Sequence, residues 1–401
     1  MTGRALGSAL SGQALFARAR FGRTLLTLAG VALTAACGAS PAPVSAPAAP
    51  PPTEVPLSTS LVTGQGTWAI AVMGGTAAGD NAFWQLFVRP AGASRWSLVT
   101  PPGVADNGGL VAAGNSATGS GAALVVGVRP SQNLVFSPLA TSTDTGRTWT
   151  PGLLGAGLAD TPGAIAVGPS GRLLAVLRNG TIEAAPSAGA AASGQWTTLT
   201  TAKALATSPA GRVCGVTGVM ASSFVPDGKP IVAGGCARPG AVGVFTDAGG
   251  TWRSAGLALP GALDRSPARV FGLAADVGGN VALLAAGGSV LAAWRDGTRW
   301  TVSAPVSALV AAGGVRAFGF GGGGSAWLLL GGGRAESIGG AGQSWQALPS
   351  VPAGTQVLAP GAGGYEALAV SGSRLTVWRL DRGAWVKAQE VNVPIQYGSS
   401  G

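Results

Sequence analysis

From residue 60 onward the chain alternates short apolar runs with turns rich in Gly, Pro, Ser and Asp. The runs are five or six residues long and contain no charged residue. Runs of this length with turn residues at both ends are typical of β-strands. No window of helical period with capping residues stands out, so the pattern predicts an all-β fold. The clearest runs are at 68–73, 123–128, 173–177, 281–285 and 326–330.

Tryptophans mark a repeat in this pattern. Seven of the 12 follow a polar, Gly-rich turn at the expected start of a strand, at intervals of 40 to 56 residues. They are Trp96, Trp149, Trp196, Trp252, Trp300, Trp345 and Trp385. A repeat of about 40–50 residues built from short strands is typical of β-propeller blades.

One complete repeat can be read around Trp300, with four runs at 270–275, 280–286, 289–294 and 299–303. A blade consists of four antiparallel strands. The spacing therefore predicts seven four-stranded antiparallel blades over residues 60–395, with six or eight as alternatives. We expect the ring to close by bringing residues 60–72 beside residues 376–395.

The turn before Trp149 carries a motif. Ser142, Asp144, Gly146 and Thr148 precede this tryptophan in the order Ser-x-Asp-x-Gly-x-Thr-Trp. The sequence resembles the Asp-box, or BNR repeat, of the sortilin, sialidase and photosystem-assembly-factor class of propellers. A second copy has Phe245 in place of the serine and keeps four residues of the motif: Asp247, Gly249, Thr251 and Trp252.

The motif has a physical explanation that needs no catalysis. A short acidic side chain accepts hydrogen bonds from backbone N–H groups just ahead of it, and glycine adopts positive φ where the chain reverses. The tryptophan then buries a large ring between neighbouring blades. We expect Asp144 and Asp247 to stabilise turns rather than to act as catalytic acids.

The N-terminus has the parts of a secretory signal. Residues 1–24 contain four arginines and no acidic residue, and residues 25–36 form an apolar run. Twelve apolar residues are too few to span a bilayer, which needs about 20. We expect residues 1–36 to be a signal peptide. A buried hydrophobic helix is the alternative, but the Ala-, Pro- and Ser-rich chain that follows offers it nothing to pack against.

Small residues lead into Cys37, in the order Thr34-Ala35-Ala36-Cys37. This tetrapeptide resembles the lipobox of bacterial lipoproteins, although Thr34 stands where that family usually has Leu. The resemblance implies a diacylglyceryl group on Cys37 and cleavage before it. Two acyl chains anchor a protein stably. Plain secretion with cleavage after an alanine is the alternative.

Proline is concentrated between the signal and the first strand. Residues 37–59 are rich in Pro, Ala and Ser, a composition that favours an extended, semi-rigid spacer. Residues 396–401 are expected to form a flexible tail. The net charge is +10, and loss of the four signal arginines leaves 21 basic against 15 acidic residues, a net charge of +6.

Composition excludes several kinds of chemistry. The chain has no histidine, which excludes Ser-His-Asp and Cys-His catalysis, and its three cysteines are too few for a four-thiolate zinc site. We expect no cofactor and no metal. An exported chain without basic clusters interleaved with aromatics is not expected to bind nucleic acid.

Cys214 and Cys236 flank a Pro-Asp-Gly turn and lie 22 residues apart. Outside the cytoplasm, two thiols at this spacing most simply form a disulfide. Two buried free thiols are the alternative.

Sialidases are the enzymes that the Asp-box resemblance brings into question. The resemblance implies an arginine triad, a Tyr–Glu nucleophile pair, an acid/base Asp and a start like Phe-Arg-Ile-Pro. Tyr365 and Glu366 are adjacent and would point to opposite faces of one strand, and Arg89-Pro90 lacks the isoleucine. The sequence therefore favours no catalytic residue.

The features together predict a lipid-anchored, monomeric propeller on the outer face of the cell membrane, secreted if the lipobox is not used. Its function is expected to be non-enzymatic binding of a protein or glycan partner. The alternatives are a sialidase-like glycoside hydrolase and an assembly factor that docks on a membrane complex.

Overall fold

The computed structural model describes residues 57–74, 82–101, 110–113, 124–128, 138–153, 162–168, 171–177, 179–276, 279–307, 314–361 and 363–394. All of them belong to the compact unit Glu54–Gly401. Every described strand pair and hydrophobic cluster lies inside this unit, so it has a core of its own. Strand structure begins at Leu57, three residues before the expected start of the propeller.

The described strands pair into five sheets, which divide into antiparallel groups of four strands that are consecutive in sequence. Group 1 is β1 (Leu57–Thr63), β2 (Gly66–Gly74), β3 (Ala82–Pro90) and β4 (Ser97–Leu98). Group 2 is β5 (Leu110–Ala113), β6 (Leu124–Val128), β7 (Pro138–Ser142) and β8 (Thr150–Leu153). Group 3 is β9 (Pro162–Val167), β10 (Leu173–Leu177), β11 (Thr181–Ala185) and β12 (Thr197–Thr201). Group 4 is β13 (Val216–Phe224), β14 (Pro230–Cys236), β15 (Gly243–Asp247) and β16 (Trp252–Ser254).

The last three groups follow the same plan. Group 5 is β17 (Ala268–Asp276), β18 (Gly279–Ala286), β19 (Ser289–Asp296) and β20 (Arg299–Val302). The short β21 (Val306–Ser307) also pairs with β19. Group 6 is β22 (Val315–Phe320), β23 (Ala326–Leu330), β24 (Ala335–Ile338) and β25 (Gln346–Leu348). Group 7 is β26 (Thr355–Gly361), β27 (Gly364–Ser371), β28 (Arg374–Asp381) and β29 (Ala384–Asn392). The pairs β1–β22 and β14–β17 join four of these groups into two larger sheets. The all-β propeller prediction is confirmed.

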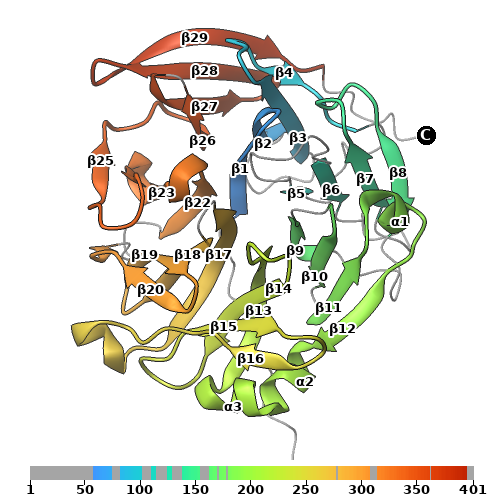
Figure 1. Ribbon diagram of the computed structural model, residues 1–401. Coiled ribbons are helices and arrows are strands. Elements are labelled where there is room, and N and C mark those ends of the chain that lie inside the picture. The colour runs from blue at the N-terminus through green and yellow to red at the C-terminus, as the bar shows by residue number, and fades with distance from the viewer. Residues whose placement is uncertain are drawn as a thin grey trace, which may run out of the picture. The chain divides into compact units, whose positions relative to one another are not determined.

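Figure 1 shows the groups following one another around a centre in which β1 lies. The alternation of side chains along each strand gives every group two apolar faces, because successive residues point to opposite sides. In group 3, for example, Leu173 and Ala175 pack toward group 2, whereas Leu174 and Val176 pack toward group 4. Each pair of successive groups shares one hydrophobic cluster in this way.

Group 7 packs against group 1, which closes the ring as expected. Ala69 and Ala71 share a cluster with Leu375, Val377 and Val391. No strand is exchanged between these two groups within the described residues. Polar side chains from group 7 bond the group 1 backbone instead. Gln356 accepts from Val72 N (2.7 Å) and donates to Val72 O (2.8 Å), and Gln389 bonds Trp96 N and O in the same way, both at 2.8 Å.

The first strand fills part of the centre of the ring. β1 pairs in parallel with β22, in a register that runs from Leu57 with Ala317 to Leu61 with Phe320. The indole Nε1 of Trp327 donates to Ser60 Oγ at 3.0 Å. A Cβ on Gly319 would lie 2.5 Å from both of these atoms, so glycine is needed there.

The described residues also contain three short α-helices that the sequence pattern did not indicate. They are α1 (Ala188–Ala192), α2 (Ala202–Thr207) and α3 (Pro209–Cys214). Each is capped by a hydroxyl side chain, from Ser187, Thr201 and Ser208 respectively. A one-turn helix is too short to show a 3.6-residue period, so only the caps could have indicated them.

Alternating hairpins give the ring two distinct ends. The chain passes from one group to the next at the end where each group's first strand starts, and the turn between second and third strands lies there too. We call this the linker end. The turns between first and second strands, and between third and fourth strands, lie at the opposite end, which we call the turn end.

Candidate functional site

The first Asp-box residues form a closed hydrogen-bond network at the turn end, between β7 and β8. Ser142 Oγ donates to Asp144 Oδ1 (3.0 Å) and accepts from Gly146 N (2.9 Å). Asp144 also accepts from Thr148 N (2.9 Å) and from Thr148 Oγ1 (2.6 Å). Gly146 has φ 79° and packs so closely on Val99 that a Cβ would lie 2.7 Å from the Val99 Cβ. The carboxylate of Asp144 therefore holds the turn.

The same contacts perturb the acidity of Asp144. Hydrogen bonds from the Thr148 side chain and backbone lower its pKa from 3.8 to about 2. A depressed folded-state pKa stabilises the fold above the unfolded pKa, and this contribution is lost as pH falls through the folded value. We expect Asp144→Asn to lower the melting temperature slightly at every pH above about 4, and the difference from wild type to disappear as pH falls from about 4 to about 2. Melting temperatures recorded from pH 6 to pH 2 test this. Asp296→Asn, at an exposed turn, is the control, and identical profiles for wild type and Asp144→Asn would contradict the prediction.

The second Asp-box turn joins β15 to β16. Asp247 accepts a hydrogen bond from Gly250 N at 2.7 Å, and Gly249 and Gly250 both have positive φ. Thr251 precedes Trp252, which opens β16. Both Asp-box acids thus bond their own turns.

The seven repeat tryptophans occupy one structural position. Each lies at the start of the outermost strand of its group and packs in the cluster shared with the preceding group. The clusters contain Trp96, Trp149, Trp196, Trp252, Trp300, Trp345 and Trp385. For Trp96 the preceding group is group 7, because the ring closes there.

The indole N–H groups show the same repetition. Trp300 donates to Ala255 O (2.8 Å), Trp345 to Ser303 Oγ (3.2 Å) and Trp385 to Pro349 O (3.2 Å). Each acceptor belongs to the residue that follows the outermost strand of the preceding group. A tryptophan is suited to this position because its ring fills the apolar interface while its N–H reaches a polar rim.

A buried carboxylate lies between groups 1 and 7, at a position outside any sequence motif. Glu366 is 1% exposed. Its Oε2 is paired with Arg89 and accepts from Trp96 Nε1 at 2.8 Å, and its Oε1 accepts from Arg379 Nη2 at 3.0 Å. Arg89 also donates to Pro360 O at 2.6 Å and lies over the Trp96 ring, 5.3 Å from its centroid. The available signal was a single acid inside the apolar run 364–371.

This cluster can be set against the arginine triad and Tyr–Glu pair that the sialidase resemblance implied. Tyr365 and Glu366 point to opposite faces of β27, because Tyr365 packs between groups 6 and 7. Burial raises the pKa of the Tyr365 hydroxyl. Arg89 and Arg379 do converge on a carboxylate, but it is the chain's own Glu366 inside a blade interface. The two arginines are thus engaged in closing the ring.

A second buried acid, Glu183 on β11, is fully buried and has no cation partner among the described residues. Thr198 Oγ1 donates to its Oε1 at 3.3 Å, and its Oε2 has no partner among them. Burial raises the pKa of Glu183. Its neighbour two residues on, Ala185, faces group 2, so the carboxyl group lies on an interblade face rather than in an open site.

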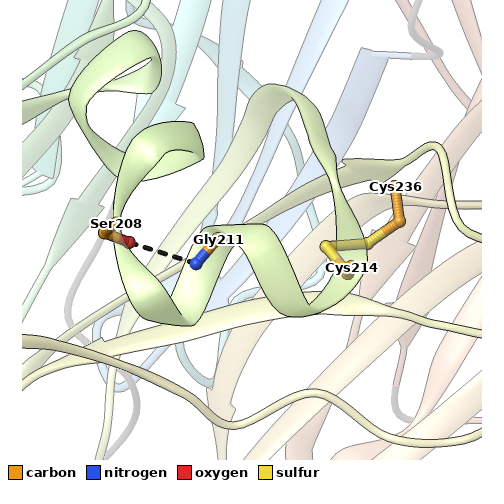
Figure 2. The surroundings of a disulfide bond; sticks show 4 residues. All are labelled: Ser208, Gly211, Cys214 and Cys236. Carbon is orange, nitrogen blue, oxygen red and sulfur yellow. Dashed lines mark hydrogen bonds between the residues drawn. A yellow bond between two sulfur atoms is a disulfide. The ribbon is translucent and has the colours of Figure 1, made fainter.

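The two cysteines expected to pair form a disulfide in the structure. Cys236 ends β14, but Cys214 lies on α3 rather than on a strand, so the bond joins the interblade connection to the hairpin (Figure 2). Ala237 N donates to Gly215 O and Arg238 N to Cys214 O, at 2.8 and 2.9 Å. This connection contains α2 and α3 and accounts for the longer interval between Trp196 and Trp252.

Some expectations concern residues outside the described ones. These are the signal peptide 1–36, Cys37, most of the 37–59 tether and the 396–401 tail. Among the described residues there is no group of three metal-ligating side chains. No helix in the described part of the chain is long and apolar enough to cross a membrane.

No protein-family model matches the chain, and no curated protein sequence matches it. Solved structures do. A candidate 6-phosphogluconolactonase of Bacteroides fragilis shares 12% identity and a TM-score of 0.50, over 81% of this chain and 95% of its own. YCF48 from Cyanidioschyzon merolae shares 15% identity and a TM-score of 0.45, over 82% and 94%. YCF48 bound to D1 peptide shares 15% identity and a TM-score of 0.44, over 86% and 93%. At these identities the likeness concerns the fold alone, and the Bacteroides protein supports the β-propeller fold found above.

Proposed function

We propose that the chain is an Asp-box propeller lipoprotein, anchored on the outer face of the cell membrane through Cys37, which acts as a non-enzymatic binding scaffold for a protein or glycan. In this proposal residues 1–36 direct export, the segment from Cys37 to the first strand is a tether, and the propeller presents its two ends. The scaffold role is supported by the contacts of the conspicuous polar side chains, which bond other parts of the fold. The Asp-box acids bond their own turns, and Glu366 with its arginines closes the ring.

The anchor gives the first test. Replacing Cys37 by Ala removes the proposed acylation site, so we expect most of the protein to move from the membrane fraction into the medium, while Ser40→Ala stays with the membrane. Fractionation of cells followed by immunoblotting measures this. Retention of Cys37→Ala in the membrane fraction would contradict the lipoprotein assignment.

The binding role is tested by crosslinking in intact cells and recovery of the wild-type protein, with Cys37→Ala as the matched sample. Recovery of the same envelope protein or glycan in repeated experiments, reduced in the Cys37→Ala sample, supports the scaffold. Hydrolysis of chromogenic glycosides by the purified protein, with loss of activity in Tyr365→Phe, would favour a sialidase-like enzyme instead.

A further inference from the structure

Five basic side chains lie on neighbouring segments at the linker end. We call them the basic rim: Lys203 on α2, Arg212 on α3, Arg238 between β14 and β15, Arg265 in the connection after β16, and Arg269 on β17. Their segments are joined by backbone hydrogen bonds from Arg238 N to Cys214 O (2.9 Å) and from Gly240 N to Ser266 O (3.0 Å). Arg269 pairs with Gly235 of β14. The segments that carry the five cations are therefore neighbours at this end, with α2 joined to α3 through Ser208.

The basic rim has no ion-pair partners within the described residues. Four of its five side chains are exposed, and Arg269 is half-buried. Asp264 is the one carboxylate on these segments. Elsewhere at the linker end, Arg334 and Arg374 are paired with Glu336 and Glu390.

The turn end is different, because most of its cations alternate with acids. Its described turns carry Asp144 with Arg147, Asp227 with Lys229, Asp296 with Arg299, and Asp381 with Arg382, whereas Arg95 and Arg172 lie in turns without an acid. A predominantly positive surface attracts anionic partners, whereas interspersed charges largely cancel at a distance of one Debye length. The attraction for an anionic partner is therefore concentrated at the linker end.

The disulfide holds the basic rim together. Arg212 lies two residues before Cys214, and Arg238 lies two residues after Cys236, so the bond between the two cysteines joins the segments that carry these arginines. Between Arg212 and the disulfide, Val213 is 53% exposed, the most exposed of the large apolar side chains in the described residues. An apolar side chain among cations suits the interface of a lipid bilayer better than a fully polar polyanion.

The chain also enters the propeller at the linker end, because β1 starts there beside the start of β22. The segment from Cys37 to Leu57 has about 20 residues, which span roughly 60 Å when extended at about 3.1 Å each. A tether of this length permits the ring to reach the membrane in many orientations. The tether therefore does not fix the orientation of the ring at the membrane, and the position of the positive charge selects it.

We propose that the basic rim lies against the anionic lipid surface to which the protein is anchored, so that the turn end with its Asp-box turns faces outward to the partner. The anchoring part of this inference rests on the proposed function. Contact with the lipid is electrostatic, through unpaired cations, and is assisted by Val213. The membrane-facing end and the partner-facing end of the propeller are thereby assigned.

Sedimentation with vesicles tests the lipid contact on the unit Glu54–Gly401, which has its own core and lacks Cys37. We expect it to bind vesicles of phosphatidylglycerol and phosphatidylcholine, but not phosphatidylcholine alone. Arg212→Glu, Arg238→Glu and Arg265→Glu together should weaken the partition coefficient at least about 100-fold, since each cation near such a surface contributes about 1 kcal/mol. The matched turn-end control, Arg95→Glu, Lys229→Glu and Arg299→Glu, changes the charge equally and should bind within about threefold of wild type.

Further variants and conditions keep the test decisive. Lysine at the three rim positions preserves the charge and should retain binding, and 0.5 M salt should abolish it. Equal loss in both triple variants, binding to neutral vesicles, or retention on a soluble polyphosphate without binding to phosphatidylglycerol would overturn the proposal. The last result would assign the rim to a wall polymer. If the vesicle experiment fails but Cys37→Ala is still released from cells, the lipid-contact proposal is wrong and the lipid-anchor proposal stands. The two proposals can therefore fail separately.

Discussion

Replacement of Glu366 by Gln is expected to lower the free energy of unfolding by about 3–5 kcal/mol, because it leaves the buried guanidinium of Arg89 without its anion. The Arg89 side chain is 11% exposed and that of Glu366 is 2% exposed, so water screens the pair little. Glutamine has nearly the same size as glutamate, and its side-chain oxygen can still accept a hydrogen bond from Trp96 Nε1. The loss of stability therefore measures the contribution of the negative charge. The Arg379 side chain is 44% exposed, so water can solvate its guanidinium after the replacement and the loss of this second ion pair should destabilise the fold less.

Urea denaturation of wild type and Glu366→Gln measures this effect. Glu390→Gln is the matched control, since Glu390 pairs with Lys387 at 2.5 Å on the surface, where water screens such pairs and they contribute little to stability. The double variant Arg89→Met with Glu366→Gln should be less destabilised than the sum of the single variants. A loss below about 1 kcal/mol for Glu366→Gln, or strict additivity in the double variant, would show that this cluster does not hold the first and last groups together.

Loss of the disulfide is expected to have the second largest effect. With Cys214 and Cys236 both replaced by Ala, the free energy of unfolding should fall by about 3 kcal/mol, because a loop of about 22 residues is no longer closed in the unfolded chain. Reduction of the wild-type protein should produce the same loss, and the double variant should not respond to reductant.

Two measurements check this prediction. Alkylation with and without prior reduction, followed by mass spectrometry, shows whether the two thiols are paired. Equal masses in the two samples would contradict the disulfide. Melting curves in both conditions give the stability. Ser223→Ala, at a buried position on β13 that pairs with the other end of β14, is the control without a covalent bond.

The repeat could be recognised from sequence because its signals are local. An apolar run with Gly-rich turns specifies a strand and its ends, and Trp300, Trp345 and Trp385 each recur at the same point of the repeat. The Asp-box turn was readable for the same reason, since Asp144 bonds residues within four positions of itself. The short capped helices were missed because one turn of helix leaves no period to detect.

The ring-closing cluster could not be recognised because its members are far apart in the chain. Arg89 and Glu366 are 277 residues apart, and neither lies in a motif. A single acid in an apolar run indicates that a partner exists, but not which of the arginines it is. The same holds for the basic rim, whose cations come from five separate segments, and for the parallel pairing of β1 with β22.

The sequence by itself determined the class of fold, the position of each tryptophan in its repeat and the turns that the Asp-box acids stabilise. These depend on backbone and side-chain preferences that act over a few residues. Only the tertiary structure decided that Glu366 closes the ring, that β1 lies in its centre and that unpaired cations gather at the linker end. Those features arise because closing the ring brings together residues whose sequence separation carries no information about their distance.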